Sequence, residues 1–214
     1  MIAYASNTGT ARNLQALRDH NWSILLTPLN PNLPKGFTHG IDNGAWTAFQ
    51  QKSEFDHALF TKLLLKHGPT SDFVVVPDIV AGGTDSLLFS KSWIPKLLDH
   101  APYLLLPVQD GMVEKEVITT LIKHARLGIF LGGSTEYKLE NMFFWGRVAN
   151  QFNRKYHVGR VNTVRRIYQC GESGASSFDG TSATRFAVNV PHLEAARRLA
   201  SNFVPRYLVE HTTD

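Results

Sequence analysis

The sequence has a single cysteine, Cys170, in its 214 residues, and this scarcity excludes two kinds of protein. One cysteine cannot close an internal disulfide, and it cannot build a zinc site from several cysteines. Cys170 lies in the segment RRIYQCGES, which is typical of the last turn of a helix before a glycine. We therefore expect a buried thiol at this position rather than a nucleophile.

Long apolar runs and common cofactor motifs are missing as well. No run is long enough to cross a membrane, and the first residues, MIAYASNTGT, lack the charged start and apolar stretch of a secretory signal. The dinucleotide fingerprint, the phosphate-binding loop, HExxH and the nucleophile elbow are also absent. We expect a cytoplasmic protein that uses neither a metal nor an organic cofactor.

The charge is only mildly positive, with 22 Lys and Arg against 18 Asp and Glu, a formal net charge of +4. This balance permits a polyanionic partner without requiring one. Six basic residues fall within segment 147–166, which contains no acidic residue. This segment is either a solvated helix face or a patch that follows a phosphate backbone. The candidates for phosphate contacts are Arg147, Arg154, Lys155, Arg160, Arg165, Arg166 and, further along, Arg185.

Short apolar segments alternate with helical patterns along the whole chain. Several segments, such as FVVVP and YLLLP, are entirely apolar, which suits parallel strands buried on both faces. The strand candidates are 1–6, 23–27, 39–42, 72–77, 103–108, 128–131, 156–161 and 176–179. The helix candidates are 10–20, 54–67, 84–98, 112–125, 135–151, 162–170 and 191–202.

This alternation indicates βα units. Eight of them predict a single domain over residues 1–214, an α/β fold of the (β/α)8 TIM-barrel type. A doubly wound open sheet is the alternative. Segment 27–38 is rich in proline and takes the place of a second helix, so we expect a loop over one end of the barrel.

Polar residues follow several of the apolar segments directly. Asp42, Asp78 and Asp179 each stand at a predicted strand end, with small residues close behind them. In a barrel these positions converge on the carboxyl-terminal rim, where active sites are built. One such aspartate is usually a helix cap or a turn residue, but that explanation does not account for three that converge. We therefore predict a shared functional site. His157, inside a strand, is expected to be a structural histidine.

Six successive strand-end segments between residues 40 and 186 together resemble the tRNA-guanine transglycosylase superfamily. The segments are DNGAW, VVPDIV, PVQDG, LGGS, YHVGRV and FDGTSATRF, in that order. The set is most similar to the 7-deazaguanine DNA transglycosylases of phage and bacterial DNA-modification systems. The resemblance implies an enzyme that replaces guanine in DNA with a 7-deazaguanine, such as 7-cyano-7-deazaguanine, through a covalent aspartyl-glycosyl intermediate.

The resemblance also implies roles for individual residues. Asp179 takes the place of the nucleophile, and Thr184 and Arg185 keep the family's spacing after it. Asp42 is the second catalytic carboxylate, which handles the proton of the base. Asp78 reads the purine edge, where a carboxylate accepts hydrogen bonds from the ring N–H and the exocyclic amine.

Further positions match the walls of the base pocket. Gln109 would contact the base oxygen, and the backbone of Gly132 and Gly133 would face the base. Val158 and Gly159 would cover one base face. Trp46 would stack on the base, with plain core packing as the alternative. The remaining base-pocket candidates are therefore Gln109, Gly132, Gly133, Trp46, Val158 and Gly159.

The chain departs from the family at one point. Its tRNA-acting members carry a zinc subdomain built from cysteines near the carboxyl terminus, and this sequence lacks the cysteines for it. DNA is therefore the expected polymer ahead of tRNA, and an accessory protein could replace the missing subdomain. A tRNA-guanine transglycosylase, a deazapurine N-glycoside hydrolase of the same fold and a non-catalytic base-binding protein stay open as alternatives.

Overall fold

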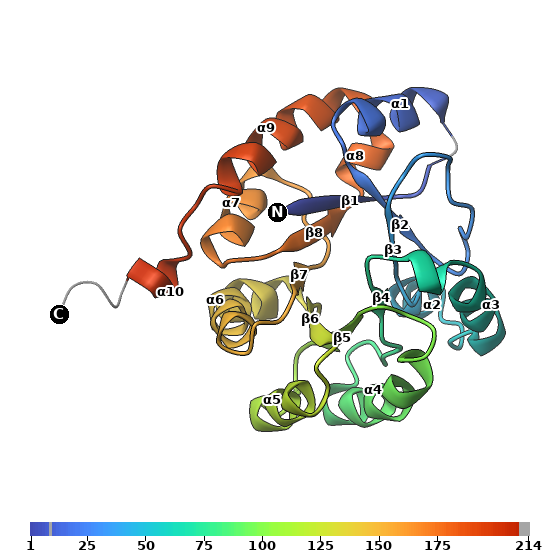
Figure 1. The fold of residues 1–214 in the computed structure, drawn as a ribbon, viewed down its shortest axis with the longest axis vertical. Coiled ribbons are helices and arrows are strands. Elements are labelled where there is room, and N and C mark those ends of the chain that lie inside the picture. The colour runs from blue at the N-terminus through green and yellow to red at the C-terminus, as the bar shows by residue number, and fades with distance from the viewer. Residues whose placement is uncertain (9, 210–214) are drawn as a thin grey trace.

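The computed structural model describes residues 1–8 and 10–209, and within them eight parallel strands close into a barrel (Figure 1). The strands pair in chain order, and β1 pairs with β8 through partners such as Tyr4 and Asp179. This closure confirms the predicted TIM-type barrel and excludes the open sheet. The strands are β1 (Ile2–Ser6), β2 (Ser23–Leu26), β3 (His39–Ile41), β4 (Val74–Val75), β5 (Leu104–Val108), β6 (Leu127–Leu131), β7 (Tyr156–Val158) and β8 (Ser177–Gly180).

Helices surround the barrel (Figure 1). They are α1 (Ala11–Asp19), α2 (Ala45–Gln50), α3 (His57–His67), α4 (Gly83–Leu97), α5 (Glu114–Lys123), α6 (Thr135–Gln151), α7 (Val164–Glu172), α8 (Ser182–Arg185), α9 (Val190–Ala200) and α10 (Arg206–Val209), with short 3-10 turns η1 (Gly68–Thr70) and η2 (Ala187–Asn189). The seven predicted helices are present, whereas α2, α8 and α10 were not predicted. Segment 27–38 contains no helix, as expected. In the described part of the chain, no helix combines the length and apolar character needed to cross a membrane.

The barrel interior is filled mainly by aromatic and aliphatic side chains. Alternate residues of a strand point to opposite faces, so one set of each strand faces the barrel axis. The buried inner set is Tyr4, Leu25, Phe73, Val75 and Leu105, with Tyr103 and Phe130 packed against it. Gly40 makes room for this packing, because a Cβ there would lie 2.6 Å from the Phe73 ring. Because side chains fill the barrel interior, a functional site is expected at the end of the barrel rather than inside it.

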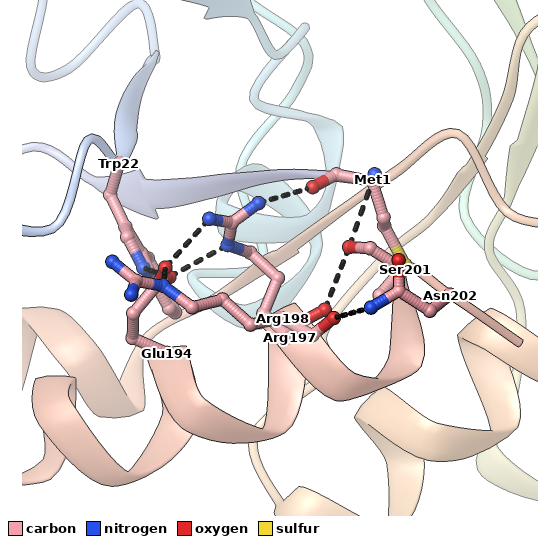
Figure 2. Close-up of polar contacts among 7 residues, drawn as sticks. All are labelled: Met1, Trp22, Glu194, Arg197, Arg198, Ser201 and Asn202. Carbon is pink, nitrogen blue, oxygen red and sulfur yellow. Dashed lines mark hydrogen bonds and ion pairs between the residues drawn. The ribbon is translucent and has the colours of Figure 1, made fainter.

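A buried glutamate on α9 ties this helix to the first two strands of the barrel. Glu194 is 2% exposed and accepts hydrogen bonds from Trp22 Nε1 at 2.9 Å and from the guanidinium groups of Arg197 and Arg198 at 2.6–2.8 Å (Figure 2). Arg197 also donates to the carbonyl of Met1 at 2.7 Å. These contacts hold the start of β1, the start of β2 and the last long helix together.

Glu194→Ala should lower the free energy of unfolding by about 2–3 kcal/mol, because the Trp22 N–H and the Arg197 guanidinium lose their buried acceptor. The midpoint of thermal unfolding, followed by circular dichroism, should fall by roughly 5–10 °C. Glu140→Ala removes an exposed glutamate on α6 and serves as the control. Equal losses in the two variants would contradict the role assigned to Glu194.

Candidate active site at the barrel mouth

Three carboxylates from three strand ends meet at the carboxyl-terminal mouth of the barrel. Asp42 directly follows β3, Asp78 follows β4, and Asp179 lies within β8. The negative charges of Asp179 and Asp78 both act on the Asp42 carboxyl. The structure therefore brings together the three aspartates that the sequence singled out, although they are far apart in the chain.

Asp42 is suited to handling a proton near neutral pH. Burial raises its pKa, and the charges of Asp179 and Asp78 raise it further, to about 7. A hydrogen bond from the backbone N–H of Gly44, at 2.6 Å, and the charge of Arg160 act in the opposite direction. Because both protonation states of Asp42 are populated near pH 7, this group can donate a proton and take one back.

Asp78 is held by an asparagine that the sequence did not single out. Asn43 is buried, and its Nδ2 donates to Asp78 Oδ1 and to the carbonyl of Val76, both at 2.8 Å. Burial raises the pKa of Asp78 to about 6, although the Asn43 hydrogen bond opposes the shift. The only sequence signal for Asn43 was its place beside Asp42 in the DNGAW segment.

The side-chain amide of Gln109 is hydrogen-bonded to the loop between β4 and α4 and to the first turn of α4. Its Nε2 donates to Ser86 Oγ at 2.7 Å and to the Ile79 carbonyl at 2.9 Å, and its Oε1 accepts from Ala81 N at 2.8 Å. The contact with Asp78 Oδ2 is longer, at 3.3 Å. The two short bonds use both N–H groups of the amide. The predicted contact with a base oxygen therefore requires this loop to rearrange.

Asp179 is 8% exposed and accepts hydrogen bonds on both oxygens. His157 Nε2 lies 3.1 Å from Oδ1, and the backbone N–H of Arg160 lies 3.3 Å from each oxygen. His157 Nδ1 is 2.8 Å from Ser177 Oγ. His157 is buried with both ring nitrogens bonded, as expected for a structural histidine, but its partnership with Asp179 was not predicted.

The two glycines after β6 have different requirements. Gly133 has φ +77°, and a Cβ there would lie 2.4 Å from Asp110 Oδ2, so the position demands glycine. Gly132 has room for a Cβ, with the nearest atom at 3.6 Å. Asp110 accepts from the backbone N–H and the hydroxyl of Ser134, both at 2.7 Å. Burial alone would raise the pKa of Asp110, but these two bonds outweigh it and hold the pKa below its ordinary value.

Trp46 and Arg160 face each other across the mouth. Trp46 lies on α2 and is 40% exposed, so the alternative of plain core packing is wrong. The Arg160 guanidinium lies 4.1 Å from the centre of the Trp46 ring and donates to the carbonyl of Gly133. Phe49 stacks on the same indole, with ring centroids 5.8 Å apart. Arg160 was predicted to contact phosphate, but here its side chain covers the surface on which a base was expected to stack.

The predicted contact between the Val158 side chain and a base is not supported. Val158 is buried against the helix layer beside Lys138 and Met142. Because strand residues alternate, His157 and Gly159 face the barrel interior, and Val158 faces away from it. Gly159 keeps its place facing the site, and its carbonyl accepts from Lys138 Nζ at 2.8 Å. Burial lowers the pKa of Lys138 to about 8, helped by the charge of Arg160.

The basic stretch does not form a single patch, because β7 passes through it. Arg154 and Lys155 precede β7, so they lie at the amino-terminal end of the barrel, where both donate to backbone carbonyls. Arg147 lies near the end of α6, which runs from the mouth back to that same end. Four of the predicted phosphate contacts follow β7 or β8 and lie at the mouth end: Arg160, Arg165, Arg166 and Arg185.

Cys170 is fully buried, and burial raises the pKa of its thiol well above the ordinary value, so the expectation of a buried thiol is confirmed. Within residues 1–8 and 10–209, no group of three or more His, Cys, Asp or Glu side chains is placed to hold a metal ion. No protein-family model matches the chain, and no match was found among curated proteins. The resemblance to the transglycosylases therefore depends on the six strand-end segments alone.

Asp42→Asn should stabilise the fold in a pH-dependent way. A folded-state pKa of about 7 means that the native protein holds a proton that the unfolded chain releases near pH 4, so the wild type loses stability as pH rises between these values. The variant, which keeps the acceptor for Gly44, should escape this loss. Its advantage in melting temperature should be small at pH 4, grow up to about pH 7 and then level off.

The control for this experiment is Asp99→Asn, which changes an exposed aspartate. Thermal melts of the wild type and both variants across pH 4–8 provide the measurement. An advantage for Asp42→Asn that stays constant over this range would contradict the raised pKa.

Proposed function

We propose that this protein is a pentosyltransferase that exchanges guanine in DNA for a 7-deazaguanine base. The observation that carries the proposal is the meeting of Asp42, Asp78 and Asp179 at one barrel mouth, each in a different environment. The order of the six strand-end segments supports the same assignment. A protein that only bound a base would need Asp78 but would have no use for Asp179.

Asp179 is the nucleophile in this proposal. Its carboxylate attacks C1′ of the target nucleotide, the C1′–N9 bond breaks, and the bonding electrons leave with the base. Asp42, with a pKa of about 7, gives the departing guanine its proton. The incoming deazaguanine then attacks C1′, returns a proton to Asp42 and releases the Asp179 carboxylate.

Asp78 supplies the recognition of the base. Guanine and 7-deazaguanines share a ring N–H and an exocyclic amine on one edge, and a carboxylate accepts from both. Asn43 holds one oxygen of Asp78 at 2.8 Å, which fixes the carboxyl plane. The same acceptor pair therefore serves the departing and the incoming base.

The rest of the mouth suits a nucleotide removed from its stack. The indole of Trp46 offers an aromatic face once the Arg160 side chain moves off it, and Arg165, Arg166 and Arg185 lie at the mouth end for contacts with phosphate. Flipping a base out of a duplex costs on the order of a few kcal/mol, and less from a single strand. The proposed enzyme is therefore expected to favour single-stranded or locally opened DNA.

The proposal is tested by incubating the protein with DNA and a labelled 7-deazaguanine, with tRNA in a parallel reaction. Label joined to DNA supports exchange. Free guanine with abasic sites identifies a hydrolase, and label joined to tRNA identifies that polymer as the substrate. If none of these products forms but the base still binds, the protein is a binding protein.

Asp179→Asn should reduce exchange by at least about 10³-fold, because an amide cannot form the glycosyl ester. The covalent intermediate, seen as a mass increase of the denatured protein after reaction with DNA, should disappear as well. Asp99→Asn is again the control and should keep both signals. Normal turnover by Asp179→Asn would remove this residue from the role of nucleophile.

Asp78→Ala should weaken guanine binding by roughly 10–100-fold, which corresponds to the loss of one bidentate contact of about 1–3 kcal/mol. Isothermal titration calorimetry with guanine measures the effect. Asp110→Ala is a matched control, because that carboxyl also lies at the mouth but is bonded to Ser134. Unchanged affinity in Asp78→Ala would contradict its role in recognition.

A further inference from the structure

The imidazole of His157 is locked in one orientation inside the barrel. The ring is 0% exposed, and the Phe130 ring lies parallel to it with centroids 5.0 Å apart and planes at 14°. Phe73 and Tyr4 pack on it at 5.1 and 5.8 Å. At its two nitrogens, Ser177 Oγ and Asp179 Oδ1 lie 2.8 and 3.1 Å away. Rotation of the ring would break both hydrogen bonds within a closed aromatic box.

The direction of the hydrogen bond to Asp179 follows from the chemistry of its partners. A carboxylate oxygen only accepts, so Nε2 of His157 carries the proton and donates it to Oδ1. Nδ1 then accepts from the Ser177 hydroxyl in the neutral ring, or donates to it in the charged ring. Both forms present the same N–H to the same oxygen of Asp179.

The two oxygens of Asp179 are consequently unequal. Oδ1 receives the His157 N–H and a share of the Arg160 backbone N–H. Among the described residues, Oδ2 receives only its share of that Arg160 N–H, at 3.3 Å. The strand pairing favours this arrangement. β7 and β8 are neighbours (Figure 1), and His157 on β7 is paired with Ser177 on β8. Because Ser177 and Asp179 are two residues apart, their side chains point to the same side of β8 and both reach the imidazole.

We propose that His157 is a positioning residue that anchors Asp179 through Oδ1 and leaves Oδ2 as the atom that bonds to the sugar, an inference that rests on the proposed base exchange. Oδ2 forms the ester bond to C1′ while the C1′–N9 electron pair leaves with the base. The oxygen held by His157 becomes the carbonyl oxygen of that ester.

The anchor contributes in both half-reactions. In the first, it holds the carboxylate in one orientation, so that the attack does not have to await a rotation about the Cβ–Cγ bond. In the second, the ester breaks and negative charge returns to the carboxylate. A preset N–H donor at Oδ1 stabilises that charge as it develops. Neither step consumes the proton of His157.

The test uses two amides that differ only in reach. The Nε2 of glutamine lies about as far from the backbone as the Nε2 of histidine, so His157→Gln can donate to Asp179. The amide of His157→Asn is shorter by one methylene and cannot. We expect kcat of His157→Asn to fall by roughly 10–100-fold, with the KM values for DNA and base little changed because His157 does not touch them. His157→Gln should recover most of the rate.

A second readout is the fraction of protein trapped as the covalent intermediate, measured by the mass of the denatured chain. It should form slowly in His157→Asn and at nearly the normal rate in His157→Gln. Both variants are purified by gel filtration, and only folded monodisperse protein is assayed. Ser177→Ala, which removes the hydrogen bond at the far nitrogen, should lose a smaller part of kcat and keeps the test open where a His157 variant does not fold.

The outcomes separate this inference from the function on which it rests. Equal kcat values for the two amide variants, or a loss confined to KM, would overturn the positioning role while the base exchange stands. Wild-type protein that forms neither an intermediate nor an exchanged product would overturn both.

Discussion

The site depends on holding three carboxylates close together at the barrel mouth, where they are partly or largely buried. Asp42 and Asp78 carry raised pKa values of about 7 and 6, and burial is the largest cause of both shifts. Such a cluster opposes folding, since burial disfavours the charged forms of Asp42 and Asp78, and the charges of Asp179 and Asp78 disfavour that of Asp42 further. The closed ladder of eight strands fixes the strand ends and so imposes the cluster. Carboxyl groups with raised pKa values at a barrel mouth are candidates for a functional site, and the proposed base exchange gives this cluster a use.

Arg160 is a positive charge that acts on the Asp42 carboxyl. Its backbone has φ +60°, a region that non-glycine residues seldom adopt, and this turn directs its N–H at Asp179. The guanidinium extends the other way, to Trp46 and the Gly133 carbonyl. This residue thus contacts both Asp179 and Trp46, and its charge acts to lower the pKa of Asp42. Backbone strain of this kind clusters at functional sites, so the conformation of Arg160 agrees with the proposed role of the mouth.

The alternation of entirely apolar segments with helices was sufficient to predict βα units, and their number, eight, favoured a barrel over the open sheet that the same pattern permits. The three aspartates were predictable for the same reason, since each marks a strand end. Helix α2 was not, because six residues show no helical period, and its Trp46 therefore had no firm position. Val158 was misjudged because a strand pattern without alternation does not reveal which face a residue takes. The basic stretch was misjudged because closeness in sequence does not show that β7 separates its two halves.

The satisfied hydrogen bonds narrow what can recognise a base. Both N–H groups of Gln109 are used, and the Gly133 carbonyl accepts from Arg160. In the proposed exchange Asp78 is therefore the recognition group, because among the described residues its Oδ2 has only the 3.3 Å contact with Gln109. A base that stacks on Trp46 has to displace the Arg160 side chain from that ring, and the same movement frees the Gly133 carbonyl. The planar guanidinium carries paired N–H donors like those on the guanine edge. When a guanine-type base takes the place of the Arg160 guanidinium, the Trp46 ring and the Gly133 carbonyl would therefore become accessible together. The backbone N–H of Arg160 would keep its hydrogen bond to Asp179.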